Sequence, residues 1–525
     1  MRYRAFRKTH PLLCDAIVWA CPAILCGLIL RLIFLHYSPY AYWGSDSRSF
    51  FGFTDGVLDH FYFSINEKRR YLYPVILLPI SLLPGGTLRW LGWIQAGLGL
   101  ATILPFAYAV RRIFANWRWF IIPLTLIYAG MPTLIWHEHE LIADTIFYNC
   151  LVWALGGWMA WTLQSQPSRA RRLFWWFLIP MALMILTKPS GVLFWPGIFA
   201  GLLLIKAWKI LRWPHWTALA LTVVVGFTSG DKKQSAWLLY ITAFPLTQLD
   251  TPLHADYKSQ IRDLVEKKRS QIAYYSSEEE EINRFLRGPG NQKDRPLWRD
   301  LDKEKGRMVS VYHDLALEGI RAHPDLFLLI GLQRLLGCAN PGDFRDTRFD
   351  ATYSARHFKE AYDGKRIPES MTRIAFGIPK SVPYPTYEEL RQRLAPYPDS
   401  AAAEWLRHYA KAYNKAGQLV HRPKEHQQPV THDRPTVLGW WLVAGLILSF
   451  LTPWRRTLGV WALATLGYLW VVYLIGIQET RYFAAAWPVI ILLLAVLPDG
   501  VMRLVMSWIN QTRLGGMPSH CAKDN

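Results

Sequence analysis

The chain has 525 residues, of which 52% are hydrophobic and 14% aromatic, and this composition excludes an intrinsically disordered protein. Its 59 Lys and Arg residues outnumber the 39 Asp and Glu residues, but a net charge of +20 does not by itself indicate a nucleic-acid partner, and we expect none. The apolar residues gather in blocks close to the roughly 20 residues that cross a hydrocarbon core of about 30 Å. This distribution predicts an all-α polytopic membrane protein.

The apolar blocks between charged or Pro/Gly-rich segments predict ten membrane spans. The first block follows a basic start but precedes no small-residue cleavage motif, so we expect a retained span rather than a signal peptide. Asp15 and Arg31, near the ends of this span, are expected to reach toward the membrane interfaces. The predicted spans cover residues 12–35, 88–110, 118–136, 141–163, 173–187, 190–208, 215–230, 436–453, 457–477 and 482–498.

The cations of the connecting segments predict the orientation, because short loops rich in Lys and Arg stay in the cytoplasm. Alternate connections carry these cations, so they all fall on one side. The basic segments are Arg2–Lys8, Arg111–Arg118, Arg169–Arg172, Lys206–Arg212 and Arg455–Arg456.

Most of the polar residues fall on the extracytoplasmic side. This side receives a first outer loop of about 37–87 and a large segment of about 231–435. The chain is therefore expected to consist of an N-terminal membrane module (1–230), an extracytoplasmic domain with its linker, and C-terminal spans with a cytoplasmic tail (436–525).

The extracytoplasmic domain is expected to be rich in helix. The patterns Ser277-x-x-Glu280 and Thr386-x-x-Glu389 are typical of capping boxes at helix starts. The apolar run 326–336 is too short to span a membrane, so we expect it on the membrane surface or in a core.

Charged residues at the outer ends of spans are the candidates for chemistry, because a charge beside hydrocarbon is costly. Asp46 lies in the run Tyr42–Ser47, just after the first span, where aromatic neighbours would partly desolvate its carboxylate and favour a general base. The alternative is a helix N-cap made by Ser45 or Asp46.

Cations occur at three further outer positions. Lys68–Arg70 lies outside against the charge rule, and its three cations would bind a phosphate through charge-assisted hydrogen bonds, with lipid headgroup anchoring as the alternative. Lys188 and Arg481, the latter within Glu479–Tyr482, lie at two other span ends. Either of these two cations alone could be a side chain that reaches the membrane interface, and several charged segments at one depth are a stronger indication of a shared site than any one of them.

The run 137–140, with the sequence HEHE, does not match the zinc motif HExxH, because position 141 is not His and two His residues two apart do not share a helix face. Helical spacing instead places His137, Glu140 and Asp144 on one face, which we expect to point into the bundle. A divalent metal bound through His137 and His139 stays open as an alternative.

The order of these features resembles the GT-C glycosyltransferases, the class that includes protein O-mannosyltransferases and the lipid A aminoarabinose transferases. The resemblance is carried by a first outer loop opening with an Asp, a basic patch before a Tyr-Pro run, an acidic turn between the third and fourth spans, a Lys-Pro after the fifth span, and a late Glu-x-Arg-Tyr. It covers about 12–230 and 436–498. Several relatives have adjacent Asp-Glu in the first loop, whereas Ser47 follows Asp46 here, which leaves no carboxylate pair for a metal.

The resemblance implies transfer of a sugar from a polyprenyl-phosphate donor to a glycan, lipid or protein hydroxyl, with the site on the extracytoplasmic face of a bacterial-type inner (plasma) membrane and no required cofactor. It implies Asp46 as the catalytic base, and direct displacement predicts inversion. The donor phosphate would be bound by Lys68, Arg69, Arg70, Lys188 and Arg481, and the substrates oriented by His137, Glu140, Asp144, Glu479 and Tyr482.

Two other functions stay open. A transporter of lipid-linked sugars would also carry charges in its spans, but secondary carriers usually show paired repeats and little mass outside the membrane, and the chain has no visible internal repeat. A polymerase or ligase of lipid-linked glycans would differ in its donor, an oligosaccharide diphosphate lipid. Incubation with each donor type distinguishes the two enzymes, and movement without covalent change would indicate transport.

Overall fold

The computed structural model describes residues 11–44, 46–63, 70–114, 118–227, 239–240, 242–243, 246–260, 262, 309–338, 358–359, 362–363, 367–394, 401–418, 437–451, 455–475, 482 and 484–515. Every regular element in these ranges is a helix, and one isolated bridge joins Tyr42 to Glu140. The prediction of an all-α chain is confirmed for the described residues.

Five helical segments among the described residues are long and apolar enough to cross a membrane. Each coincides with a predicted span, which confirms the prediction of transmembrane helix character. They are α2 (Pro11–Tyr37), α5 (Thr87–Ala101) continued by α6 (Ile103–Ile113), α10 (Pro167–Thr187), α24 (Arg456–Ile475), and η8 (Ala484–Ala486) continued by the first part of α26 (Trp487–Gly515).

The other five predicted spans also coincide with helices, but none of these helices meets the same criteria of length and apolarity. That they cross a membrane stays a prediction. They are α7 (Ile121–Ala129) with α8 (Pro132–His137), α9 (Asp144–Thr162), η2 (Pro189–Phe194) with α11 (Trp195–Leu204), α12 (Trp213–Phe227) and α23 (Val437–Leu451).

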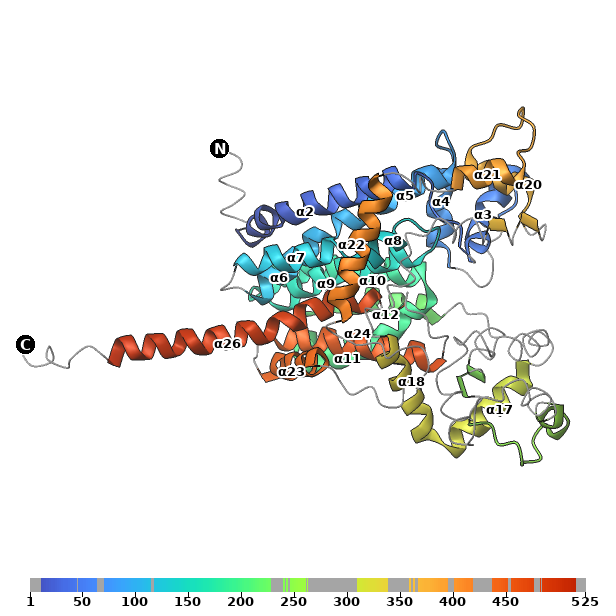
Figure 1. Cartoon of the computed structure of the whole chain (residues 1–525). Helices are drawn as coiled ribbons and strands as arrows, with labels where there is room; N and C mark the ends of the chain where they lie inside the picture. Colours follow the sequence, from blue (N-terminus) through green and yellow to red (C-terminus); the bar gives the residue numbers. More distant parts are fainter. Residues whose placement is uncertain are drawn as a thin grey trace, which may run out of the picture.

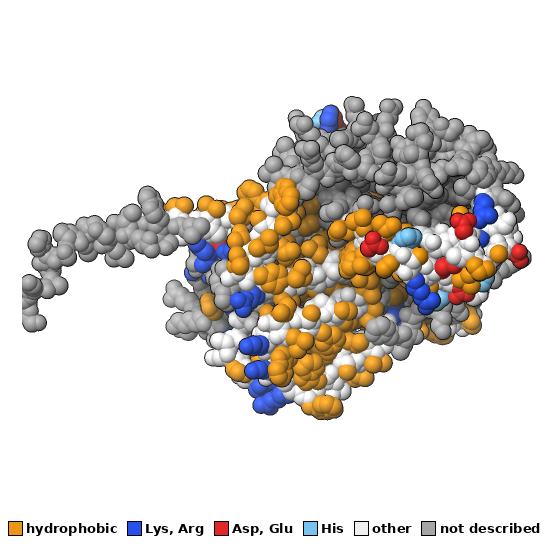
Figure 2. Space-filling model, turned by 90° about the horizontal axis from the view of Figure 1, so that it is seen from below, with side chains coloured by type: hydrophobic (Ala, Val, Ile, Leu, Met, Phe, Trp, Pro, Cys, Tyr) orange, Lys and Arg blue, Asp and Glu red, His pale blue; other side chains and the backbone are white. Residues whose placement is uncertain are grey.

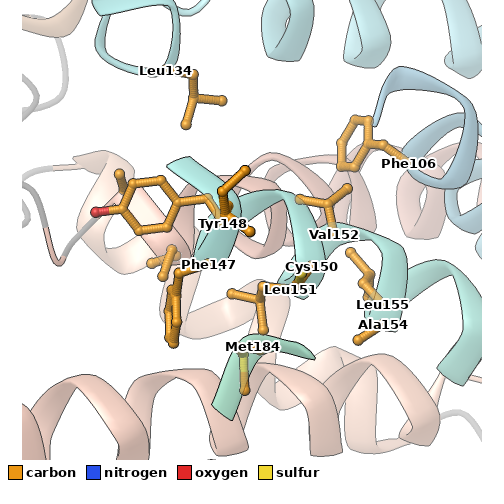
Figure 3. Close-up of a cluster of buried hydrophobic side chains, with 14 of the residues drawn as sticks. Phe106, Leu134, Phe147, Tyr148, Cys150, Leu151, Val152, Ala154, Leu155 and Met184 are labelled. Atoms are coloured by element: carbon orange, nitrogen blue, oxygen red, sulfur yellow. The ribbon is translucent and has the colours of Figure 1, made fainter. Parts of the chain in front are cut away.

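Helix α9 lies at the centre of the core and is covered on nearly all sides. Its second half packs closely on α10, because Gly157 lets the backbones approach: a Cβ added there would lie 2.5 Å from the Phe177 nitrogen. The rings of Trp161 and Phe177 stack across this contact with centroids 5.7 Å apart, and Figure 3 shows Leu151 next to Met184. Since α9 contacts protein rather than lipid, it can carry polar side chains in its first turns.

The two ends of the bundle differ in what they carry. Figure 1 shows α3 (Ser47–His60), α20 (Glu369–Phe376) and α21 (Tyr387–Leu394) at one end, and the start of α2 and the far part of α26 at the other. Arg455 forms a buried ion pair with Asp499 of α26. Figure 2 shows a face whose middle is covered by apolar side chains, with Lys and Arg along one margin and acidic, basic and His side chains mixed at the opposite end.

Asp15 and Arg31 of α2 are both buried and form ion pairs with distant segments. That they reach the membrane interfaces stays a prediction. Asp15 pairs with Arg111 at 3.3 Å and with Arg118 at 3.4 Å. Arg31 pairs with Glu138 through two short contacts of 2.5 and 2.7 Å. The opposite charges come from segments far along the chain, so the sequence of α2 alone does not reveal them.

The described parts of the predicted extracytoplasmic domain pack on the bundle at separate places. Helix α18 (Pro324–Cys338), which contains the apolar run 326–336, lies against α24, where the Trp470 indole donates to the Leu328 carbonyl oxygen at 3.2 Å. Helix α20 lies on α3 and α5, and α22 (Ala401–Gln418) lies along α2. Packing on the membrane-embedded part therefore contributes to the stability of this domain.

Two local expectations in this domain have different outcomes. The capping box at the start of α21 is confirmed, because the Thr386 N–H donates to Glu389 Oε2 at 2.7 Å and the Glu389 N–H donates to Thr386 Oγ1 at 3.4 Å. The pattern at Ser277 and Glu280 lies outside the described residues. A further helix, α17 (Val309–Ala322), precedes α18.

A contact between two glycines fastens the end of α20 to the turn before α5. Gly86 has φ +89° and Gly377 has φ +63°, a backbone region that favours glycine. A Cβ added to Gly86 would lie 2.3 Å from the Gly377 nitrogen, so the two backbones touch. This contact places the segment 378–394 beside the first outer loop.

Candidate functional site

Backbone pairing fastens the first outer loop to the turn before α9. The Tyr42 N–H donates to the His139 carbonyl oxygen at 2.6 Å, and the Leu141 N–H donates to the Tyr42 carbonyl oxygen at 3.0 Å. The Ser47 hydroxyl also donates to the Leu141 carbonyl oxygen, at 3.0 Å. These bonds hold Asp46, the neighbour of Ser47, close to the beginning of α9.

Asp46 occupies the N-cap position of α3, but its side chain makes no capping hydrogen bond. Its backbone is helical, with φ −90° and ψ −13°, whereas capping residues are typically extended. The structure therefore gives no support to a capping role for the Asp46 carboxylate, which is half-buried. The other residue proposed as a cap, Ser45, lies outside the described residues, and the role of Asp46 as a base stays a prediction.

Lys188 and Asp144 form the closest pairing of a predicted phosphate ligand with a predicted orienting residue. Lys188 Nζ lies 2.5 Å from Asp144 Oδ1, and the Tyr148 hydroxyl donates to the same oxygen at 3.2 Å. The Lys188 ammonium also lies 4.0 Å from the centre of the Tyr482 ring, a distance typical of a cation–π contact. We call Asp144, Tyr148, Lys188 and Tyr482 the Lys188 cluster.

The local sequence explains where the two charges lie. Pro189 disfavours a helical backbone at the residue before it, so α10 ends at Thr187 and Lys188 is extended, with φ −146° and ψ 129°. Asp144 is in the first turn of α9, where the N-terminal end of a helix stabilises a carboxylate. The Asp144 side chain is 3% exposed and that of Lys188 18% exposed, so the ammonium is the more accessible of the two.

Tyrosine and serine side chains that sequence reasoning missed complete the surroundings of the cluster. The Tyr468 hydroxyl of α24 lies 3.3 Å from the Ser190 hydroxyl, two residues after Lys188. Its ring stacks on Phe194 with centroids 4.3 Å apart. Tyr148 was also missed, although its position one helical turn after Asp144 could have indicated that the two side chains are neighbours. The sequence gives no comparable indication for Tyr468 or Ser190.

Glu140 and His137 lie beside the loop that carries Asp46. His137 Nδ1 is 3.5 Å from Glu140 Oε2, but α8 ends at His137 and α9 begins at Asp144, so the helix face predicted for His137, Glu140 and Asp144 is not formed. A Cβ added to Gly44 would lie 2.4 Å from Glu140 Oε1, which shows how closely the carboxylate approaches the first outer loop. The Gln95 amide of α5 donates to the carbonyl oxygens of Glu138 at 3.1 Å and Glu140 at 2.9 Å. These two bonds hold the turn between α8 and α9 in place.

The two histidines proposed as metal ligands face different neighbours. The His139 ring meets the rings of Phe34 and Tyr42 edge-on, with centroids 4.7 and 5.2 Å away, and its burial lowers the pKa of His139 to about 4. His137 lies beside Glu140 instead. Within the described ranges, no group of three or more His, Cys, Asp or Glu side chains is placed to hold a metal ion.

The remaining predicted phosphate ligands are not brought to the Lys188 cluster in the described part of the chain. Arg70 is buried, and its guanidinium donates to the carbonyl oxygens of Val225 at 3.1 Å and Gly226 at 2.5 Å, at the end of α12. Its role in phosphate binding stays a prediction. Lys68, Arg69, Glu479 and Arg481 lie outside the described residues.

Comparison of the chain with protein-family models, with curated proteins and with solved structures finds no match.

The chemistry available to the site follows from its parts. An ammonium has three N–H donors, so Lys188 can keep its bond to Asp144 and still donate to a second anion. The aromatic rings around it reduce the local dielectric and strengthen such a bond. The partly exposed Lys188 side chain is therefore the part of the cluster that an anionic group can reach.

Proposed function

We propose that the chain is a membrane glycosyltransferase that moves a sugar from a polyprenyl-phosphate donor to an acceptor hydroxyl on the extracytoplasmic face. The observation that carries the proposal is the Lys188 cluster: a partly accessible ammonium, paired with a buried carboxylate, at the ends of apolar helices. A lipid phosphate requires a cation at this position, because its tail must remain among apolar helices while its head group is bound. The loop that carries Asp46 is fastened next to the same helix end.

The proposal includes the topology predicted from the sequence. We propose ten spans, with the beginning of α2 in the cytoplasm, the extracytoplasmic domain 231–435 inserted before the last three spans, and an inner-membrane location. Two observations support this orientation. Arg111 and Arg118 pair with Asp15 near the beginning of α2, and the helices α3, α20 and α21 lie at the other end, as Figure 1 shows.

The reaction proposed is a single displacement with inversion at the anomeric carbon. The acceptor oxygen forms a bond to this carbon while the bond between the carbon and the phosphate oxygen breaks, and the electron pair leaves with the polyprenyl phosphate. The acceptor proton passes to the Asp46 carboxylate, which acts as the base. Lys188 stabilises the charge that develops on the departing phosphate. Water is a competing acceptor, so its exclusion by α3 and the aromatic residues favours transfer.

Replacement of Asp46 by Asn tests the proposal. We expect Asp46→Asn to reduce transfer from a radiolabelled polyprenyl-phosphate sugar by at least about a hundredfold, because the amide cannot accept the acceptor proton. Binding of the donor, measured by fluorescence of a labelled polyprenyl phosphate, should change little.

The matched control is Asp59→Asn in the same helix. Asp59 pairs with the exposed Lys380 at 2.6 Å, away from the Lys188 cluster, and its replacement should leave transfer near the wild-type rate. Substantial transfer by Asp46→Asn would remove the base assignment, and absence of transfer by the wild-type protein with every donor sugar supplied would reject the proposed function.

A further inference from the structure

An open pocket lies between the first outer loop and α21, at the end of the bundle that carries α3. Its volume is about 770 Å³, within the range of roughly 300–1,000 Å³ found for small-molecule sites. Pro39 and Tyr40 line one side, and residues between 378 and 393 line the other. The two sides come from segments far apart in the chain, which are joined by the contact between Gly86 and Gly377 and by the ring contact between Tyr40 and Phe376.

The far wall of this pocket is held rigidly. The Tyr384 hydroxyl donates to Thr372 Oγ1 at 3.2 Å, and the Arg373 guanidinium lies 5.6 Å from the centre of the Tyr384 ring. The same guanidinium donates to the carbonyl oxygens of Pro379 at 2.8 Å and Val382 at 2.9 Å. A wall that is already ordered does not lose conformational entropy when a ligand binds, which favours affinity.

The lining residues combine apolar rings with hydrogen-bonding side chains. Tyr40 and several prolines provide apolar surface, and the exposed side chains of Glu389, Gln392 and Arg393 project from α21 with both donors and acceptors. A sugar ring has the matching chemistry, because its hydroxyl groups surround the ring edge and its C–H groups form apolar patches.

Peptide and lipid ligands fit this lining less well. Pro39, Pro383 and Pro385 have no N–H to donate to a peptide backbone, and no strand edge occurs among the described residues to pair with one. The polar side chains of α21 do not suit an acyl chain. The lining therefore favours a saccharide.

The first outer loop connects this pocket to the proposed reaction centre. Tyr40 lines the pocket, Tyr42 pairs with His139 and Leu141, and the loop then reaches Asp46. We infer that the pocket binds the acceptor and that the acceptor is a saccharide whose terminal hydroxyl extends toward Asp46. This inference rests on the proposed function, and it adds the acceptor class and the residues that bind it.

The experiment uses the full-length protein in detergent and an array of immobilised oligosaccharides, with proline-rich peptides as additional probes. We expect the wild-type protein to bind at least one oligosaccharide, and the double variant Gln392→Ala/Arg393→Ala to bind it about tenfold more weakly, because two side-chain hydrogen bonds are lost. The control is Arg391→Ala, an exposed arginine of the same helix that pairs with Glu388 at 2.7 Å and does not line the pocket. It should bind as the wild-type protein does.

A second assay distinguishes failure of the inference from failure of the proposed function. Cleavage of the polyprenyl-phosphate sugar with water as the acceptor should be equal in the wild-type protein and the double variant, whereas transfer to the bound oligosaccharide should fall in the double variant alone. Equal transfer by both proteins, binding of no oligosaccharide, or preferential binding of a proline-rich peptide would overturn the inference. Absence of both donor cleavage and sugar transfer by the wild-type protein would instead contradict the proposed function.

Discussion

Replacement of Lys188 by Met is expected to reduce sugar transfer by at least about a hundredfold, because one charged donor to a developing anion contributes roughly this factor or more. The ammonium that would stabilise the leaving phosphate is removed, and the methionine side chain retains a similar length without charge. Rates should be measured with a radiolabelled polyprenyl-phosphate sugar and purified protein. Lys188→Arg keeps a cation and should retain more activity than Lys188→Met.

The loss could instead reflect unfolding, since Lys188→Met leaves the buried Asp144 carboxylate without its closest cation. The double variant Lys188→Met/Asp144→Asn removes both charges and separates these effects. We expect it to recover the midpoint of thermal unfolding but to remain inactive, because the phosphate still lacks its cation. Recovery of transfer in the double variant would show that Lys188 has a structural role only.

Replacement of Glu138 by Gln should cause the largest loss of stability, about 3 kcal/mol in the free energy of unfolding. It leaves the Arg31 guanidinium, which is 5% exposed, as a buried charge without its carboxylate partner. Arg31 also donates to the carbonyl oxygens of Gly27 and Ala129, both at 3.2 Å, so it cannot easily move to solvent. The measurement is thermal unfolding in detergent, in which the midpoint should fall clearly below that of the wild-type protein.

Two further variants control for the loss of a charge as such. Lys380→Met breaks an ion pair in which the lysine is 81% exposed, and pairs of this kind contribute at most about 1 kcal/mol, so its midpoint should barely change. The double variant Arg31→Met/Glu138→Met removes both buried charges and should unfold at a higher temperature than Glu138→Gln. Equal midpoints for Glu138→Gln and Lys380→Met would contradict the importance of the buried pair.

The long apolar helices were predictable because their signal is local. One continuous apolar stretch predicts a span such as α10, and the proline after Lys188 predicts where this helix ends. The candidate status of Lys188 and Asp144 was predictable for a related reason, since charges at span ends are costly wherever the neighbouring helices lie.

The partners of these charges were not predictable, because they depend on how distant helices pack. Lys188 and Asp144 are 44 residues apart, and Arg31 and Glu138 are 107 residues apart. The residues around Arg31 give the same local pattern whether or not a carboxylate lies opposite, so the pairing with Glu138 could not be read from α2 alone.

The pocket beside α21 was hidden from sequence reasoning for the same reason. Tyr40 and Gln392 belong to segments that are far apart in the sequence and meet through contacts such as those between Gly86 and Gly377 and between Asp59 and Lys380. Neither glycine stands out in the sequence, since each lies in an ordinary turn or helix-end context. The capping box at Thr386 was found because it is a short pattern whose hydrogen bonds are local.

The most direct test of the account is a structure of the full-length protein in lipid nanodiscs with a polyprenyl-phosphate sugar bound. We expect the donor phosphate to lie within hydrogen-bond distance of Lys188 Nζ, with the lipid tail among the apolar helices and the anomeric carbon facing Asp46. A phosphate bound at the opposite end of the bundle, beside Arg111 and Arg118, or an anomeric carbon facing away from Asp46, would contradict it.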